Sequence, residues 1–129
     1  MTEYELIDAA NSTASQAMAA TQYALSIVTG YLLIAHFMGR KLTLFQVSFV
    51  NGIFILMHTV VMFALVAHAK RVQVLLLKLS ESGSDVAVFA TLLMAPDRQP
   101  SGLVAYVIGG LITLGCLVFM WQVRHPKAG

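Results

Sequence analysis

Residues 38–46 have the sequence MGRKLTLFQ and separate two long uncharged segments. Gly39 can take the left-handed backbone conformation that commonly closes a helix. Thr43 and Gln46 have the spacing of a capping box, in which the side chain of each residue satisfies a free backbone N–H of the other. The stretch therefore predicts that one helix ends before Gly39 and that another begins after Thr43. Because the connection is so short, the two helices should form an antiparallel hairpin.

Uncharged sequence continues on both sides of this turn and recurs near the C-terminus. Residues 9–39, 42–69 and 99–123 are windows of 31, 28 and 25 residues without one Asp, Glu, Lys or Arg. A helix needs about 20 apolar residues to cross a bilayer. The 129-residue chain is 58% apolar and 11% charged, whereas soluble domains are roughly one quarter charged. We therefore expect an all-α integral membrane protein, a single domain with three transmembrane helices.

The hairpin should be longer than the bilayer is thick. Thr2 and Glu5 also have capping-box spacing, which places the first helix at about 3–38. A helix of this length measures about 54 Å, and the hydrocarbon layer is only ~30 Å thick. The second helix is expected over about 44–80, because helix-compatible apolar sequence continues almost to Gly83. The open end of the hairpin should therefore project beyond the bilayer.

Two further helices are expected after the hairpin. The apolar segment 85–95 is too short to span, so it should lie in the headgroup boundary, pack on the hairpin, or enter the bilayer and return. Ser101 can cap a third span over about 102–124. This span should end before Pro126, because the residue before a proline disfavours helical geometry.

Basic residues alone do not orient the chain. With the N-terminus outside the cytoplasm, the inner side has Arg40, Lys41, Arg124 and Lys127, and the outer side has Lys70, Arg71, Lys78 and Arg98. The hairpin should bring the outer residues close to the acidic residues Glu3, Glu5 and Asp8, with which we expect ion pairs. The inner residues have no acidic neighbour, so the positive-inside rule favours an outside N-terminus and a cytoplasmic C-terminus.

One face of the first helix consists mainly of polar and small residues. They recur at spacings of three and four, which places them in one stripe: Ser12, Ser15, Ala19, Gln22, Ser26, Thr29, Leu33 and His36. Residues at equal height in the hairpin should have numbers that sum to roughly 80 to 82, because the turn is centred near residue 41. We therefore expect two hydrogen-bonded contacts between the helices, Gln22 with His58 and Thr29 with Asn51, since intramembrane polar groups normally face protein or water.

His58 also has a functional interpretation. An ionisable residue near the bilayer midplane is a candidate for a proton or ion path, which the polar residues Gln22, Ser26, Thr29 and Asn51 could extend. However, no Asp or Glu lies in any of the three windows to relay a proton or bind a cation.

The third span has a face of small residues, namely Gly102, Ala105, Gly109, Thr113 and Cys116. Small residues let helix backbones approach closely. This face should therefore pack on the hairpin of the same chain or on a neighbouring chain.

We expect no cofactor, no metal site and no catalytic residue. A haem needs two axial ligands at one depth, and His36, His58 and His68 lie at different depths. Cys116 is the single cysteine, and no carboxylate in the spans could join it as a second metal ligand. The basic residues are scattered, which excludes the clustered basic face of a nucleic-acid-binding protein.

The sequence therefore favours a non-catalytic membrane subunit that self-assembles as a homo-oligomer or docks on other membrane subunits. The alternative is a homo-oligomeric pore for protons or a small ion, lined by the polar stripe of the first helix. A haem-bearing electron carrier, with His58 paired across an oligomer axis, is a distant third hypothesis.

Overall fold

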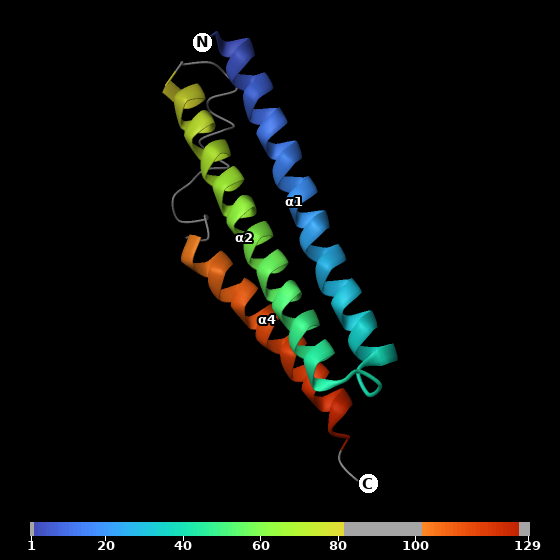
Figure 1. The fold of residues 1–129 in the computed structure, drawn as a ribbon. Helices are drawn as coiled ribbons and strands as arrows, with labels where there is room; N and C mark the ends of the chain where they lie inside the picture. Colours follow the sequence, from blue (N-terminus) through green and yellow to red (C-terminus); the bar gives the residue numbers. More distant parts are fainter. Residues whose placement is uncertain (1, 82–101, 127–129) are drawn as a thin grey trace.

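The computed structural model describes residues 2–81 and 102–126, which form three long helices and no strand (Figure 1). The helices are α1 (Glu3–Met38), α2 (Leu44–Glu81) and α4 (Gly102–Arg124). Each is long and apolar enough to cross a membrane. The helix bounds agree with the ranges expected from the sequence, and α2 continues without a break past the membrane-length window. The short helix expected over 85–95 lies outside the described residues.

Both predicted capping boxes are present. The backbone N–H of Thr2 donates to Glu5 Oε2 at 2.7 Å, and the N–H of Glu5 donates to Thr2 Oγ1 at 3.3 Å. The N–H of Thr43 donates to Gln46 Oε1 at 2.9 Å, and the N–H of Gln46 donates to Thr43 Oγ1 at 3.3 Å. The hairpin helices begin at these residues because the bonds satisfy backbone donors that have no partner within a helix.

The turn differs from the prediction at Gly39. Its φ of −53° and ψ of −37° are right-handed, so the expected left-handed closure is wrong. The chain instead winds into the turn through hydrogen bonds from the N–H groups of Lys41 and Leu42 to the Met38 carbonyl, at 2.8 and 3.1 Å. A Cβ at Gly39 would lie 3.1 Å from Val123 Cγ1 and would also collide with a carbonyl oxygen of α1. A side chain at position 39 would therefore require the end of α1 to move and Val123 to shift.

Two arginines tie the end of α4 to this turn. Arg40 Nε donates to the Val123 carbonyl at 3.2 Å, and Arg124 Nη1 donates to the Leu42 carbonyl at 2.9 Å. Carbonyl groups at helix ends and in turns lack partners within a helix, so they are free to accept these bonds. The two bonds fix the C-terminal end of α4 beside the turn, where Figure 1 shows α4 lying along the hairpin.

The core lies in the half of the bundle nearest the turn, where all three helices meet. Its buried residues are Tyr31 and Ala35 from α1, Val47 and Phe54 from α2, and Cys116 and Met120 from α4. The ring of Tyr31 stacks on Phe54 with a centroid separation of 4.1 Å. Its hydroxyl donates to Asn51 Oδ1 at 2.7 Å. Tyr31 therefore fills the core and also makes a polar contact between α1 and α2.

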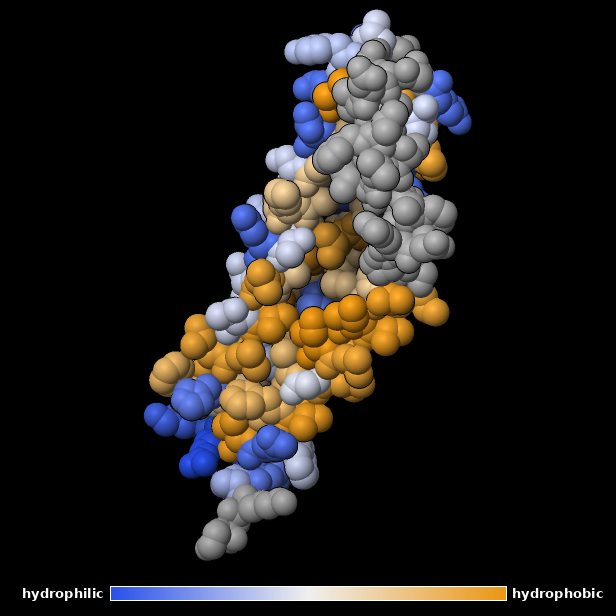
Figure 2. Space-filling model, turned by 180° about the vertical axis from the view of Figure 1, so that it is seen from behind, coloured by the Kyte–Doolittle hydropathy of each residue, from blue (hydrophilic) through white to orange (hydrophobic). Residues whose placement is uncertain are grey.

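The surface of the described chain is apolar around its middle. Figure 2 shows an orange belt, with blue hydrophilic residues concentrated toward the two ends and along the edge formed by α1. Leu56 of α2 and Leu111 of α4 are each 63% exposed. A three-helix bundle has too little interior to bury most of its apolar side chains, so they face outward.

Replacing Tyr31 by Phe should remove the hydrogen bond to Asn51 and keep the ring stack. We expect Tyr31→Phe to lower the free energy of unfolding in detergent micelles by about 1 kcal/mol, because Asn51 loses its partner. Tyr23 is 66% exposed, so Tyr23→Phe should leave the unfolding free energy unchanged. In a double-mutant cycle, Tyr31→Phe and Asn51→Ala should be coupled, and strictly additive effects would contradict the contact.

Candidate functional site

The polar stripe of α1 faces away from the rest of the described chain. We call it the α1 polar face, and its eight residues are Ser12, Ser15, Ala19, Gln22, Ser26, Thr29, Leu33 and His36, all of which are exposed. The residues of α1 that contact the core lie on another side, with Ala20, Tyr31 and Ala35 buried. At about 100° per residue, the two sets are centred roughly 180° apart around the helix axis. The α1 polar face is therefore an outer surface of the single chain.

This orientation contradicts the two predicted polar contacts within the hairpin. Gln22 is exposed, while His58 is buried and neither of its ring nitrogens has a hydrogen-bond partner. Thr29 is exposed too, and Asn51 accepts its hydrogen bond from Tyr31 instead. The expected height of Asn51 was correct, because the residue numbers of Tyr31 and Asn51 sum to 82. The expected rotation of α1 about its axis was wrong.

Another face of α1 carries the contact that sequence reasoning assigned to the polar face. It combines the small residues Ala20, Ala24 and Ala35 with Tyr31, and all four are buried or half-buried. The small residues allow close helix approach. The signal was present in the sequence, but it competed with the polar stripe for the same role.

The small face of α4 packs against α2 of the same chain. A Cβ at Gly109 would lie 2.8 Å from Met62 Cε, and a Cβ at Gly102 would lie 3.7 Å from Val66 Cγ1. Thr113 and Ala105 are half-buried, and Cys116 is buried in the core. The Thr113 hydroxyl donates to the Gly109 carbonyl at 2.9 Å, so it needs no partner on another helix. This face is thus occupied within the chain.

A groove of about 390 Å³ lies between α2 and α4, with His58 in its lining. His58 is 4% exposed, and its ring is tilted against Phe54 with the centroids 5.6 Å apart. Farther along the groove, Phe63 of α2 and Tyr106 of α4 are in edge contact at 5.6 Å. The groove therefore places one imidazole among apolar and aromatic side chains.

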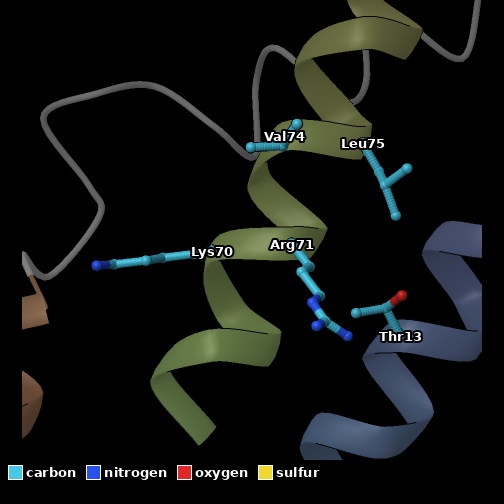
Figure 3. Close-up of a pocket in the computed structure, with 5 residues that line it drawn as sticks. All are labelled: Thr13, Lys70, Arg71, Val74 and Leu75. Atoms are coloured by element: carbon cyan, nitrogen blue, oxygen red, sulfur yellow. The ribbon is translucent and has the colours of Figure 1, made fainter. Parts of the chain in front are cut away.

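A second hollow, of about 360 Å³, lies between α1 and α2 near the open end of the hairpin. Figure 3 shows that the guanidinium of Arg71 points toward Thr13, whereas Lys70 extends in a different direction. The Thr13 hydroxyl donates to the Ala9 carbonyl at 2.8 Å. The two cations diverge, so they do not form a converging site for an anion.

The open end of the hairpin brings acidic and basic residues together without pairing the described ones. The start of α1 and the end of α2 lie at the same end of the hairpin (Figure 1). Glu5 and Asp8 belong to the start of α1, and Lys70, Arg71 and Lys78 belong to the last third of α2. Among these five side chains there is no ion pair, so the predicted pairing is wrong for them; Glu5 instead caps α1. Exposed pairs contribute little free energy, which leaves solvated side chains free to separate. A pair that involves Glu3 falls outside the described side chains.

The histidines of the described chain do not converge. His36 on α1 and His125 after α4 are exposed, whereas His58 and His68 are buried or half-buried at separate heights on α2. Within residues 2–81 and 102–126, no three His, Cys, Asp or Glu side chains come together as a metal site.

Comparison with known proteins identifies no relative: no family model, no curated protein and no solved structure matches the chain. The functional inference therefore rests on the α1 polar face and on the basic residues at the turn.

Replacing Gly109 by Leu should weaken the packing of α4 on α2. We expect Gly109→Leu to lower the free energy of unfolding by about 1–3 kcal/mol, because the new side chain overlaps Met62. Gly115→Leu on the same helix is the control, since a Cβ there meets nothing within 4 Å. Adding Met62→Ala to Gly109→Leu should restore part of the loss. If the double variant loses as much unfolding free energy as Gly109→Leu alone, Met62 is not the group that the new side chain displaces.

Proposed function

We propose that the protein is a non-catalytic integral membrane subunit that crosses the bilayer three times and assembles with further copies of itself through the α1 polar face. The observation that carries this proposal is the exposure of all eight residues of that face in the single chain. Docking of the same face on a different membrane subunit is the heteromeric form of the proposal.

The lengths and charges of the helices support membrane insertion. α4 has 23 residues and measures about 34 Å, which is close to the ~30 Å hydrocarbon thickness. Its end beside the turn carries Arg124 near Arg40 and Lys41, and none of the described acidic residues lies at this end. By the positive-inside rule, this end is cytoplasmic and the N-terminus is outside. α1 and α2 then project beyond the outer surface of the bilayer.

Exposed polar groups on the α1 polar face need a partner inside a bilayer. The Ser26 hydroxyl donates to the Gln22 carbonyl at 2.9 Å, so it is satisfied within the helix. The Gln22 side-chain amide has no such bond to a described residue, and lipid can offer none. An amide both donates and accepts hydrogen bonds, so two Gln22 side chains can pair across a two-fold axis. The neighbouring small residues Ala19 and Ser26 permit the close approach that this pairing needs.

The second candidate is a homo-oligomeric pore for protons or a small ion. It is favoured by the length of the α1 polar face, which continues from Ser12 to His36 and would line a shared axis in a ring of copies. In this arrangement water, rather than a second glutamine, would satisfy the polar side chains.

Replacing Gln22 by Leu should weaken self-assembly. We expect the dissociation constant of the oligomer in lipid nanodiscs to rise roughly 3- to 30-fold, the equivalent of ~0.6–2 kcal/mol for one intramembrane hydrogen-bonded contact. Thr21→Leu is the matched control, because Thr21 is exposed on α1 outside the polar face and its hydroxyl donates to the Ala17 carbonyl. The measurement is oligomeric mass by native mass spectrometry over a range of protein-to-lipid ratios.

A monomer at every ratio would refute self-assembly through this face. Proton and K⁺ flux into liposomes that contain the wild-type protein separates the two candidates. Flux above that of empty liposomes, reduced by Gln22→Leu but not by Thr21→Leu, would favour the pore over the subunit.

A further inference from the structure

Three basic residues gather where the turn of the hairpin meets the end of α4. We call Arg40, Lys41 and Arg124 the basic cluster. Arg40 Nε donates at 3.2 Å to the carbonyl of Val123, the residue before Arg124. Arg124 Nη1 donates at 2.9 Å to the carbonyl of Leu42, the residue after Lys41. The two hydrogen bonds therefore keep all three basic residues at one end of the bundle.

The basic cluster has no acidic counterpart among the described residues at its end of the molecule. The acidic residues of the described helices lie at the start of α1 or the end of α2, and they are Glu3, Glu5, Asp8 and Glu81. Figure 1 shows these two segments at the opposite end of the hairpin from the turn. Arg40 and Lys41 are exposed, and Arg124 is half-buried. Uncompensated positive charge at a surface attracts an anion from outside the chain.

Both arginines of the basic cluster keep hydrogen-bond donors for a further partner. A guanidinium has five N–H donors in a planar fork that matches the oxygens of a phosphate. Within the described chain, Arg40 donates through Nε and Arg124 through Nη1, which leaves other Nη donors of both groups for a ligand. The basic cluster therefore offers two guanidinium forks and one ammonium group to a phosphate.

Exposed apolar side chains place the basic cluster beside a surface that suits acyl chains. Trp121 of α4 is 62% exposed, and its ring lies against that of His125 with the centroids 5.3 Å apart. Trp is enriched where lipid head groups meet acyl chains. Trp121 precedes Arg124 by about 4.5 Å along the helix axis. Leu44 and Phe45, which begin α2 after the turn, are 76% and 79% exposed. A ligand that fits both surfaces combines an anionic group with apolar chains.

We propose that the basic cluster binds the phosphate of an anionic phospholipid in the cytoplasmic leaflet. The acyl chains of this lipid contact the exposed apolar side chains of α2 and α4 beside the cluster. Phosphatidylglycerol, which has a net negative charge, binds more tightly than phosphatidylcholine, because the choline ammonium offsets the charge of its phosphate. The proposal rests on the membrane insertion and orientation proposed above and is independent of self-assembly.

The test is lipid binding to the full chain in detergent micelles, counted by native mass spectrometry. Phosphatidylglycerol and phosphatidylcholine with identical acyl chains are titrated separately. We expect phosphatidylglycerol to bind about tenfold more tightly or better, because each basic residue near a bilayer surface adds roughly a factor of five. This preference should shrink as the ammonium acetate concentration is raised, since salt screens exposed charges.

Two variants remove charge from the basic cluster. Lys41→Gln should weaken phosphatidylglycerol binding about fivefold. Its ammonium group has no hydrogen bond to a described residue, so this variant leaves the fold intact. Arg40→Gln/Lys41→Gln should weaken binding about 25-fold. Arg40 also bonds to Val123, so thermal unfolding of each lipid-free variant verifies that it is folded.

The matched controls remove the same charges from the far part of α2. Lys78→Gln is the control for the single variant, and Lys70→Gln/Arg71→Gln is the control for the double variant. Both controls should bind phosphatidylglycerol as the wild type does. The side chains of Lys70 and Arg71 diverge (Figure 3), so they do not form a shared phosphate site.

Three results would overturn the proposal. The first is equal affinity for the two lipids, and the second is an equal loss of affinity in the controls and the cluster variants. The third is binding of inorganic phosphate as tight as that of phosphatidylglycerol, which would indicate a site for soluble anions.

Flotation with phosphatidylcholine liposomes at high salt tests the membrane insertion separately. A protein that floats with these liposomes but does not prefer phosphatidylglycerol would refute lipid recognition and leave the proposed membrane subunit standing. A protein that stays in the soluble fraction would refute the insertion on which both proposals rest.

Discussion

The rotation of α1 about its own axis determines which of its residues contact the other helices and which face outward. Tyr31 fixes that rotation, because its ring stacks on Phe54 and its hydroxyl binds Asn51. Successive residues of a helix are rotated by about 100°, so residues two apart, such as Tyr31 and Leu33 or Thr29, point to nearly opposite sides. With Tyr31 turned inward, the α1 polar face must therefore turn outward. The same contact leaves the buried His58 without a hydrogen-bond partner from α1, and His58 is among the residues that line the groove beside α4.

The docking of α4 on α2 places the groove and the α1 polar face on different sides of the hairpin. Gly109 allows α4 to approach Met62 of α2, and the arginine contacts at the turn hold its other end. The groove therefore lies between α2 and α4, while the α1 polar face lies on the far side of the hairpin.

Several elements of the fold follow from short-range patterns in the sequence. Thr2 with Glu5 and Thr43 with Gln46 place the starts of the hairpin helices, because a capping box depends on residues three apart. Gly39 shows the limit of local reasoning. Its presence indicates a turn, but its conformation is right-handed, and its role depends on Val123, which is distant in sequence. The arginine contacts with the turn are equally non-local.

The sequence by itself determined the three long helices, their lengths and the height at which Tyr31 and Asn51 meet, because these depend on helical period and on the five-residue connection 39–43. Only the tertiary structure decided which face of α1 turns inward. In a bilayer there is no hydrophobic drive to bury an apolar face, so small and polar stripes are both plausible contacts. Packing of Tyr31 and Ala35 against α2 and α4 decided between them, and it thereby placed the α1 polar face outside and His58 in the groove.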